Sequence, residues 1–235
     1  MSLAVVITTY NRSNVLKLNL DCFKQQTDMD FEIMVAIDGS TDQTKEMLAD
    51  YKAPFPIKWV DTLENNKYCL AKARNMGIIE TTRPIVVILD DDSFPSETFV
   101  AAHKTSVTRK VLTGGYRNSH DPQDSLHPKM KKLLLKYGVK NPHPITERLV
   151  ENNTCMYRQD WIGCGMFSER FEGYGGCGQE FIARLAYQGF KYQFNPEAMM
   201  YHHREFEGDN GLTRETKDHQ AIEMSKIIEK HCWSY

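Results

Sequence analysis

The sequence predicts an α/β fold, in which a mostly parallel sheet is flanked by helices within a single composite domain. Segments typical of strands and of helices alternate through the first half of the 235-residue chain, an order that builds parallel sheets with helices on both faces. One of these segments, "PIVVILD" (84–90), is almost continuously apolar, as a strand covered on both faces should be. No linker rich in Gly, Pro or Ser divides the chain into two independent units.

The elements of the first half follow from local signals, taken in chain order. The apolar run "LAVVITT" (3–9) predicts the first strand. The helix after it has Ser13 or Asn14 as its cap and apolar residues at helical spacing. The later units repeat this pattern. The further predicted strands cover 31–38, 57–62, 84–90 and 110–115, and the predicted helices cover 13–26, 40–51, 70–80 and 96–107.

The second half has a different character. A basic helix bounded by prolines is expected within 125–144. A glycine-rich loop then leads into a helix from about Gln179 to Gln188. One or two strands are expected over 191–204, and a terminal helix over 213–233.

Composition argues against several classes of function. The net charge of -2 supplies no general basic field for nucleic acid. No apolar run approaches the roughly 20 residues that span a bilayer, and the N-terminal apolar run is too short for a signal peptide. The six cysteines form no C-x-x-C pair, so reduced thiols are expected. We therefore expect a cytoplasmic chain without a transmembrane segment, or a soluble domain of a longer one.

Three polar clusters stand at the ends of predicted strands. They are "TTYNR" (8–12), "DGSTD" (38–42) and "DDDS" (90–93). Because ligands of open parallel sheets bind beyond the carboxyl ends of the strands, these clusters predict one shared binding site.

The carboxylates of Asp90, Asp91 and Asp92 are the most demanding part of this site. Two like charges 4 Å apart cost about 4 kcal/mol at an effective dielectric of 20, so either open water or a cation must accompany them. Side chains alternate along extended backbone, which places Asp90 and Asp92 on one side and Asp91 on the other. Oxygen ligands with open positions for phosphate suit Mg²⁺ or Mn²⁺. The alternative is a solvated acidic turn before a helix that begins near Ser96.

Four segments, in this order and spacing, resemble the family 2 glycosyltransferases of GT-A fold. They are "VVITTYNR" (5–12), "VAIDGSTDQT" (35–44), "LAKARNMGI" (70–78) and "VVILDDDSFPS" (86–96). The resemblance covers residues 3 to about 206. The segments "ENNTCMYRQDW" (151–161), "FSERFEGYGGCGQEFIARL" (167–185) and "MMYHH" (199–203) resemble the acceptor region of galactosyltransferase-like members.

This resemblance implies an inverting, metal-dependent glycosyltransferase. Its donor would be a nucleotide diphosphate sugar, with a UDP-sugar favoured, and its acceptor a hydroxyl group of a glycan or small molecule. The implied division is a donor-binding half (1–115), an acceptor-binding half (116–210) and a C-terminal helix (211–235). The C-terminal helix could form a homodimer with a second copy of the chain.

The resemblance also implies roles on the donor side. Thr9, Tyr10 and Arg12 would line the nucleotide pocket. Asp38 would accept a hydrogen bond from the base, and Arg74 would lie near the donor phosphates or sugar.

The same resemblance implies the metal site. Asp90 and Asp91 would contact the donor, and Asp92 would hold Mn²⁺ or Mg²⁺. His202 or His203 would add a ligand from the far half of the chain.

The sequence departs from the family where the catalytic base is expected. Inverting transfer needs a base for the proton of the acceptor hydroxyl. Relatives usually supply an acidic pair, which falls here on Cys177 and Gly178. Glu180 is the favoured substitute. The alternatives are that Glu180 only pairs with Arg184, as i, i+4 neighbours do, and that the base is Glu169, Glu172 or the acceptor itself.

The acceptor side is expected around the glycine-rich loop. Gly175 and Gly176 indicate a sharp bend or a close approach to a ligand. Trp161 and Tyr174 are candidates to stack on an acceptor sugar, and both are equally compatible with the core.

Two other functions compete with transfer. The missing acidic pair leaves open a nucleotide-sugar-binding protein without transferase activity. A nucleotidyltransferase ranks last, because "TTYNRSN" (8–14) lacks the glycines of a phosphate-binding loop.

Overall fold

The structure, a computed structural model, describes residues 1–118, 151–171 and 176–202 of the chain. Within them, eight strands form one sheet in the order β3-β2-β1-β4-β7-β6-β8-β5. The strands are β1 (Leu3–Thr9), β2 (Phe31–Ile37), β3 (Ile57–Asp61), β4 (Ile85–Asp90), β5 (Ser93–Pro95), β6 (Val111–Asn118), β7 (Thr154–Tyr157) and β8 (Lys191–His202). The helices are α1 (Ser13–Phe23), α2 (Thr44–Asp50), α3 (Leu70–Glu80), α4 (Phe99–Ser106), α6 (Arg158–Gly163) and α7 (Cys177–Tyr187).

The predicted α/β sheet is confirmed, and its two ends differ in strand direction. β1 pairs in parallel with β2 and β4, and β2 pairs in parallel with β3. β7 then joins β4 and β6 in antiparallel fashion, while β8 runs parallel to β6 and antiparallel to β5. The sheet is therefore parallel in the first half of the chain and mixed in the second.

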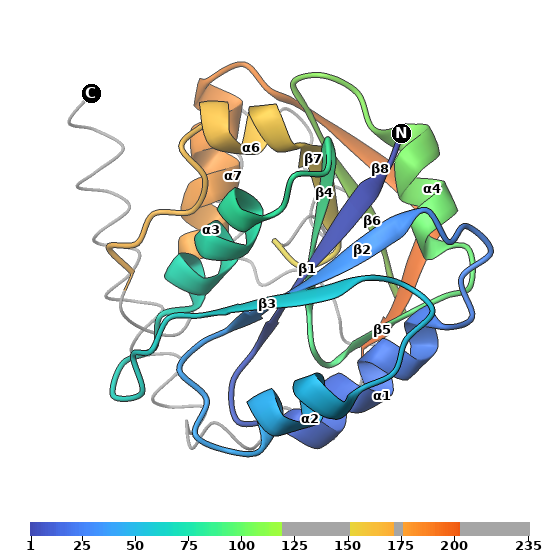
Figure 1. The fold of residues 1–235 in the computed structure, drawn as a ribbon. Helices are drawn as coiled ribbons and strands as arrows, with labels where there is room; N and C mark the ends of the chain where they lie inside the picture. Colours follow the sequence, from blue (N-terminus) through green and yellow to red (C-terminus); the bar gives the residue numbers. More distant parts are fainter. Residues whose placement is uncertain (119–150, 172–175, 203–235) are drawn as a thin grey trace.

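The alternation of side chains along β1, β2 and β4 builds two hydrophobic layers. Val6 and its neighbours on one face pack against α3, α6 and α7, where Trp161 and Phe181 are buried. Val5 and Ile7 on the other face pack against α1, α2 and α4. Figure 1 shows α3, α6 and α7 together on one side of the strands and α1 and α2 on the other.

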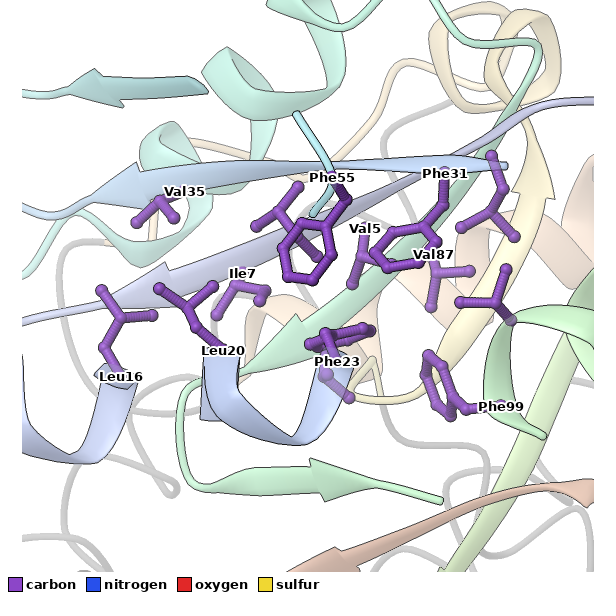
Figure 2. Close-up of a cluster of buried hydrophobic side chains, with 14 of the residues drawn as sticks. Val5, Ile7, Leu16, Leu20, Phe23, Phe31, Val35, Phe55, Val87 and Phe99 are labelled. Carbon is purple, nitrogen blue, oxygen red and sulfur yellow. The ribbon is translucent and has the colours of Figure 1, made fainter. Parts of the chain in front are cut away.

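Aromatic rings fill much of the second layer. Figure 2 shows Leu16, Leu20 and Phe23 of α1 under the strands, with Phe23 close to Phe31 and Phe55. The ring of Phe31 lies 5.7 Å from that of Phe23 and 4.8 Å from that of Phe55. Such contacts add to the burial of apolar area, so the loop before β3 is fixed to the helix after β1.

Three elements were missed by the sequence prediction. β5 has three residues and ends in a proline, a composition that is tolerated at the edge of a sheet, where β5 lies. β7 and α6 follow a polar run and are short, so they carry little periodicity. Helices α2 and α4 also begin three to four residues later than predicted, after turns, at Thr44 and Phe99.

Some expected elements lie outside the described residues. These are the basic helix within 125–144 and the terminal helix of residues 211–235. Among the described residues, no helix is both long and apolar enough to cross a bilayer.

Candidate functional site

The polar clusters at the ends of β1, β2 and β4 meet at one edge of the sheet. Thr8 pairs with Asp90 across the β1–β4 ladder, and Thr9 pairs with Ile37 across the β1–β2 ladder. The next loop connects them further, because Asn11 Oδ1 accepts a hydrogen bond of 2.7 Å from the backbone of Thr41. The residues that follow β1, β2 and β4 therefore form a single polar edge, as the topology predicts.

Arg12 and Thr9 hold the carboxylates of Asp91 and Asp92. The hydroxyl of Thr9 donates to Asp91 Oδ2 over 2.7 Å. Arg12 Nη1 lies 3.2 Å from Asp91 Oδ1 and 3.1 Å from Asp92 Oδ2. One guanidinium thus bridges both carboxylates, and it supplies part of the positive charge that they require.

Burial makes the charged forms of these carboxylates costly. Asp91 is 4% exposed, and burial, reinforced by neighbouring Asp92, raises the pKa of Asp91 to about 7 against the opposing effects of Arg12 and Thr9. Burial and Asp90 also raise the pKa of Asp92, while His202 and Arg12 lower it. Further positive charge at this edge would therefore favour the ionised cluster.

Two buried asparagines fix the backbone of the acidic turn. Asn19 of α1 donates from Nδ2 to the carbonyl oxygens of Asp91, at 3.0 Å, and of Ser93, at 2.7 Å. Asn152 accepts from the backbone of Asp90 at 3.0 Å and donates to the hydroxyl of Ser93 at 2.8 Å. The turn is thereby held by α1 and by the segment that precedes β7.

Asp92 and His202 form the best candidate for a metal site. Asp92 Oδ1 is buried and accepts no hydrogen bond from the described residues. His202 Nε2 lies 3.6 Å from it. An orphaned carboxylate oxygen beside an imidazole nitrogen fits two ligands of one divalent ion.

A complete metal site needs more ligands than this pair. Across residues 1–118, 151–171 and 176–202, no three His, Cys, Asp or Glu side chains converge as metal ligands. A resident ion would therefore take its remaining ligands from a bound anion and water, as Mg²⁺ and Mn²⁺ commonly do. His203, the other predicted metal ligand, lies outside the described residues.

Asp38 occupies a buried position after β2. Its carboxylate accepts hydrogen bonds from the backbone of Cys69, at 3.0 and 3.2 Å, and from the hydroxyl of Thr62, at 3.5 Å. Burial is the main reason that the pKa of Asp38 is raised to about 6. Gly39 turns the chain here with a φ of +68°, and an added Cβ would lie 2.4 Å from the Glu64 carbonyl oxygen.

Arg74 lies beneath the site and contacts two carboxylates. It is 1% exposed. Its Nη2 donates to Asp90 Oδ1 over 2.8 Å, and its Nη1 lies 3.4 Å from Glu151 Oε1. The guanidinium also lies over the Phe167 ring, 5.2 Å from its centroid. This burial favours a role in holding Asp90 over the direct donor contact that the resemblance implies.

Glu180, the favoured catalytic base, is engaged by Arg184. The Nε of Arg184 lies 2.6 Å from Glu180 Oε1, and its Nη2 lies 3.1 Å from Oε2. Arg184 also donates to the carbonyl oxygens of Cys164 and Met166. Both oxygens of Glu180 thus accept from one arginine, which is the arrangement expected under the pairing alternative.

The predicted acceptor residues fall into three groups. Trp161 is fully buried, stacks on Phe181 at 5.0 Å and donates from Nε1 to the Val86 carbonyl oxygen. This placement favours its core alternative, since no face of the ring is open to a sugar. Gly176 precedes α7 with a φ of +83°. Tyr174 and Gly175 lie outside the described residues.

The sequence prediction missed Glu151, Asn19 and Asn152. Asn19 stands on the buried stripe of α1 between Leu16 and Leu20, and a polar residue within an apolar stripe is the signal that would have identified it. Glu151 and Asn152 directly precede the buried strand β7. No local sequence pattern predicts that β7 pairs with β4 in antiparallel fashion, and this pairing brings both residues to the site.

Comparison with known proteins identifies relatives of this chain. The family model described as "Glycosyl transferase family 2" matches residues 4–147, more than half of the chain. The chondroitin synthase of Pasteurella multocida (strain Pm70) is 26% identical over 271 residues, covering 100% of this chain and 28% of that protein. The validoxylamine A glucosyltransferase of Streptomyces hygroscopicus subsp. jinggangensis (strain 5008) is 35% identical over 155 residues, covering 63% of this chain and 32% of that protein.

A solved structure supports the fold. The crystal structure of GalNAc-T7 with UDP, GalNAc and Mn²⁺ matches with a TM-score of 0.72 at 15% identity, covering 98% of this chain and 48% of that chain. The fold is thus that of GT-A glycosyltransferases. The chain spans less than a third of the length of the two curated relatives that it matches.

Proposed function

Because the chain belongs to glycosyl transferase family 2, we propose that it transfers a sugar from a nucleoside diphosphate donor, a UDP-sugar, to a hydroxyl acceptor. The transfer inverts the anomeric carbon and depends on a divalent cation. The observation that carries the proposal is the pair formed by Asp92 and His202, whose facing atoms lie 3.6 Å apart at the carboxyl edge of the sheet.

The nucleotide lies across the ends of β1 and β2. Asp38 accepts a hydrogen bond from an N–H of the base at the buried end of β2, where its other partners are donors as well. Tyr10 is 40% exposed, so its ring is available to stack on the base. Thr9 and Arg12 line the path from the base to the diphosphate and keep Asp91 in place.

Asp92 and His202 hold the cation. When bound, Mn²⁺ or Mg²⁺ neutralises the charge that develops on the leaving diphosphate. An imidazole nitrogen in the ligand pair favours Mn²⁺ over Mg²⁺, since Mg²⁺ prefers oxygen ligands. Asp90 and Asp91 then contact the ribose and sugar from the turn that Asn19 and Asn152 hold.

The acceptor approaches from the side of α7. The names of the relatives, a chondroitin synthase and a glucosyltransferase that acts on validoxylamine A, support a glycan or a small-molecule hydroxyl as the acceptor. The start of α7 lies on this side, where Gly178 is next to Glu151 and Cys177 is next to Arg74.

Binding of nucleotides by the whole chain tests this function. A ligand that binds only the folded state raises its apparent stability, so the melting temperature is measured with UDP, GDP and their sugars, each with Mn²⁺ and with EDTA. The proposal expects stabilisation by UDP and a UDP-sugar in Mn²⁺, and UDP release when hydroxyl acceptors are added. A chain that no nucleotide stabilises would contradict it.

A nucleotide-sugar-binding protein without transferase activity is the second candidate, and the observation that favours it is Cys177–Gly178 at the start of α7, where no carboxylate stands. It predicts the same thermal response to UDP and Mn²⁺ without UDP release for any acceptor. Turnover by the wild-type chain decides between the two.

A further inference from the structure

Inverting transfer requires a basic atom that faces the acceptor hydroxyl, and the described carboxylates around the site differ in whether they offer one. Asp91 and Asp92 are bridged by Arg12. Asp90 accepts from Arg74 at 2.8 Å and from the hydroxyl of Thr8 at 3.2 Å. These three stand on the donor side of the site, where their negative charge serves the cation and the ribose.

Glu180 is also a poor source of a basic lone pair. Its two oxygens accept from Arg184 at 2.6 and 3.1 Å, and Arg184 is itself fixed by two carbonyl oxygens. The proton of an acceptor hydroxyl would have to displace one of these two charge-assisted hydrogen bonds to reach Glu180. The Glu180–Arg184 pair therefore links α7 to the loop that follows α6 and has a structural role.

Glu151 offers a carboxylate oxygen that lies outside this donor cluster, at the start of α7. Its Oε1 lies 3.4 Å from Arg74 Nη1, and the same guanidinium holds Asp90 through Nη2. One arginine therefore places the Glu151 carboxylate beside a carboxylate of the donor site. The side chain of Glu151 is 21% exposed, so solvent and an acceptor reach it. Within the described part of the chain, its Oε2 has no hydrogen-bond donor.

Gly178 marks where this second oxygen lies. A Cβ added to Gly178 would lie 1.9 Å from Glu151 Oε2, far inside any real contact. The oxygen therefore occupies the volume that a side chain at 178 would fill, at the start of α7. Because residue 178 is a glycine, the carboxylate of Glu151 can lie against the start of α7.

We propose that Glu151 is the general base of the transfer, an inference that rests on the proposed function. The acceptor oxygen forms the bond to the anomeric carbon while the bond between that carbon and the diphosphate oxygen breaks. The proton of the acceptor hydroxyl passes to Glu151 Oε2, and the diphosphate leaves with the electron pair. Arg74 is a positioning residue, since it holds Glu151 and Asp90 at a fixed separation.

The test compares Glu151→Gln with Glu180→Gln in the whole chain. Glu151→Gln keeps the shape and removes the basic oxygen, so kcat for UDP release from a UDP-sugar with a hydroxyl acceptor should fall on the order of 10²- to 10⁴-fold. The affinity for UDP in Mn²⁺ should stay within about twofold of wild type, because the donor side is untouched. The decrease in kcat should be smaller in Glu180→Gln than in Glu151→Gln. The decrease in melting temperature should be larger in Glu180→Gln.

Glu151→Asp distinguishes a catalytic defect from a folding defect. It keeps the charge that faces Arg74 and withdraws the oxygens from Gly178 by one methylene. It should therefore melt near wild type and still lose most of kcat.

The outcomes separate this inference from the proposed function. Wild-type turnover that survives in both Glu151 variants, or a larger kcat loss in Glu180→Gln than in Glu151→Gln, would overturn the assignment of Glu151 alone. A wild-type chain that binds no nucleotide and releases no UDP would overturn the proposed function, and with it this inference.

Discussion

Asp92 Oδ1 and His202 Nε2 lie 3.6 Å apart, although the two residues are far apart in the sequence. Their approach is set by backbone pairing, because Ser93, the residue after Asp92, is the register partner of His202 in the β5–β8 ladder. The short edge strand β5, which no sequence pattern predicts, thus brings the imidazole of His202 to the acidic turn. Asp92 and His202 are held as a pair before any ligand arrives.

This pair predicts how binding responds to metal. Replacing Asp92 with Asn should abolish the strengthening of UDP binding by Mn²⁺, and replacing His202 with Gln should weaken Mn²⁺-dependent binding on the order of 10- to 100-fold. Calorimetric titration of UDP measures both effects. Titration in EDTA is the control, where the two variants should match wild type. Equal Mn²⁺ responses in wild type and Asp92→Asn would show that the ion is bound elsewhere.

Asn19 should matter for both stability and the site. Its amide donates to the carbonyl oxygens of Asp91 and Ser93, and Asn19→Ala would leave buried acceptors without partners, at a cost of about 2–3 kcal/mol in the free energy of unfolding. Affinity for UDP in Mn²⁺ should fall as the acidic turn loosens. Urea unfolding and calorimetry measure the two effects.

The same helix offers a matched control for Asn19. Asn14 is exposed on α1, and Asn14→Ala should change the free energy of unfolding by no more than about 0.5 kcal/mol. If the two alanine variants were equally stable and bound UDP equally, the bracing role of Asn19 would be wrong.

The sequence predicted the parallel part of the fold well. The apolar runs of residues 3–9, 31–37 and 85–89 became buried strands, because a strand covered on both faces must be apolar throughout. The convergence of Thr9 and Asp91 followed from topology alone, since parallel strands end at the same edge. These are local signals combined with one general rule of α/β sheets.

What the sequence could not predict depends on contacts between distant segments. The burial of Arg74 beneath Asp90, and its second contact with Glu151, arise only once β7 lies antiparallel to β4. Trp161 offered no sign of whether its ring faced a ligand or the core, because an aromatic residue serves both. Glu180 and Arg184 had the spacing of a helical ion pair, and the structure shows that pair formed.

Gly178 provides a prediction that needs no change to any charged group. Gly178→Ala places a methyl group where Glu151 Oε2 lies, so the carboxylate must move away from the start of α7. We expect kcat to fall at least tenfold, with a change of less than about 1 kcal/mol in the free energy of unfolding, since the displaced atom is the end of a flexible side chain. Single-turnover kinetics with UDP-sugar measures the effect on the chemical step.

Gly163→Ala is the control for this substitution. Gly163 is the last residue of α6, and nothing lies within 4 Å of a Cβ added there. The variant should keep its kcat and be as stable as wild type or slightly more so. Full activity in Gly178→Ala would mean that the position of the Glu151 carboxylate does not limit the reaction.

His103 should make the stability of the fold depend on pH. The residue is fully buried on α4 and its Nε2 lies 2.8 Å from Asn153 Oδ1, while Nδ1 has no hydrogen-bond partner among the described residues. Burial lowers the pKa of His103 to about 4, against the smaller opposing effect of Asn153, and the pKa of an unfolded histidine is about 6.5. As the pH falls through this interval, His103 binds a proton in the unfolded chain but not in the folded chain. The contribution of His103 to the free energy of unfolding is therefore complete above pH 6.5 and is lost toward pH 4. The loss amounts to about 3 kcal/mol by pH 4.

A variant isolates this contribution from the other titrating groups. Asp38 and Asp91 act with the opposite sign, because their raised pKa values of about 6 and about 7 make the fold more stable as the pH falls toward 4. The curve of the wild type alone therefore mixes these contributions with that of His103. In His103→Gln only the histidine contribution disappears. The variant should be less stable than wild type at pH 7.5, and the difference in unfolding free energy should shrink by about 3 kcal/mol on going to pH 4. Urea unfolding of both chains at half-unit steps measures this difference, and a gap that stays constant with pH would mean that His103 is as easily protonated in the folded chain as in the unfolded one.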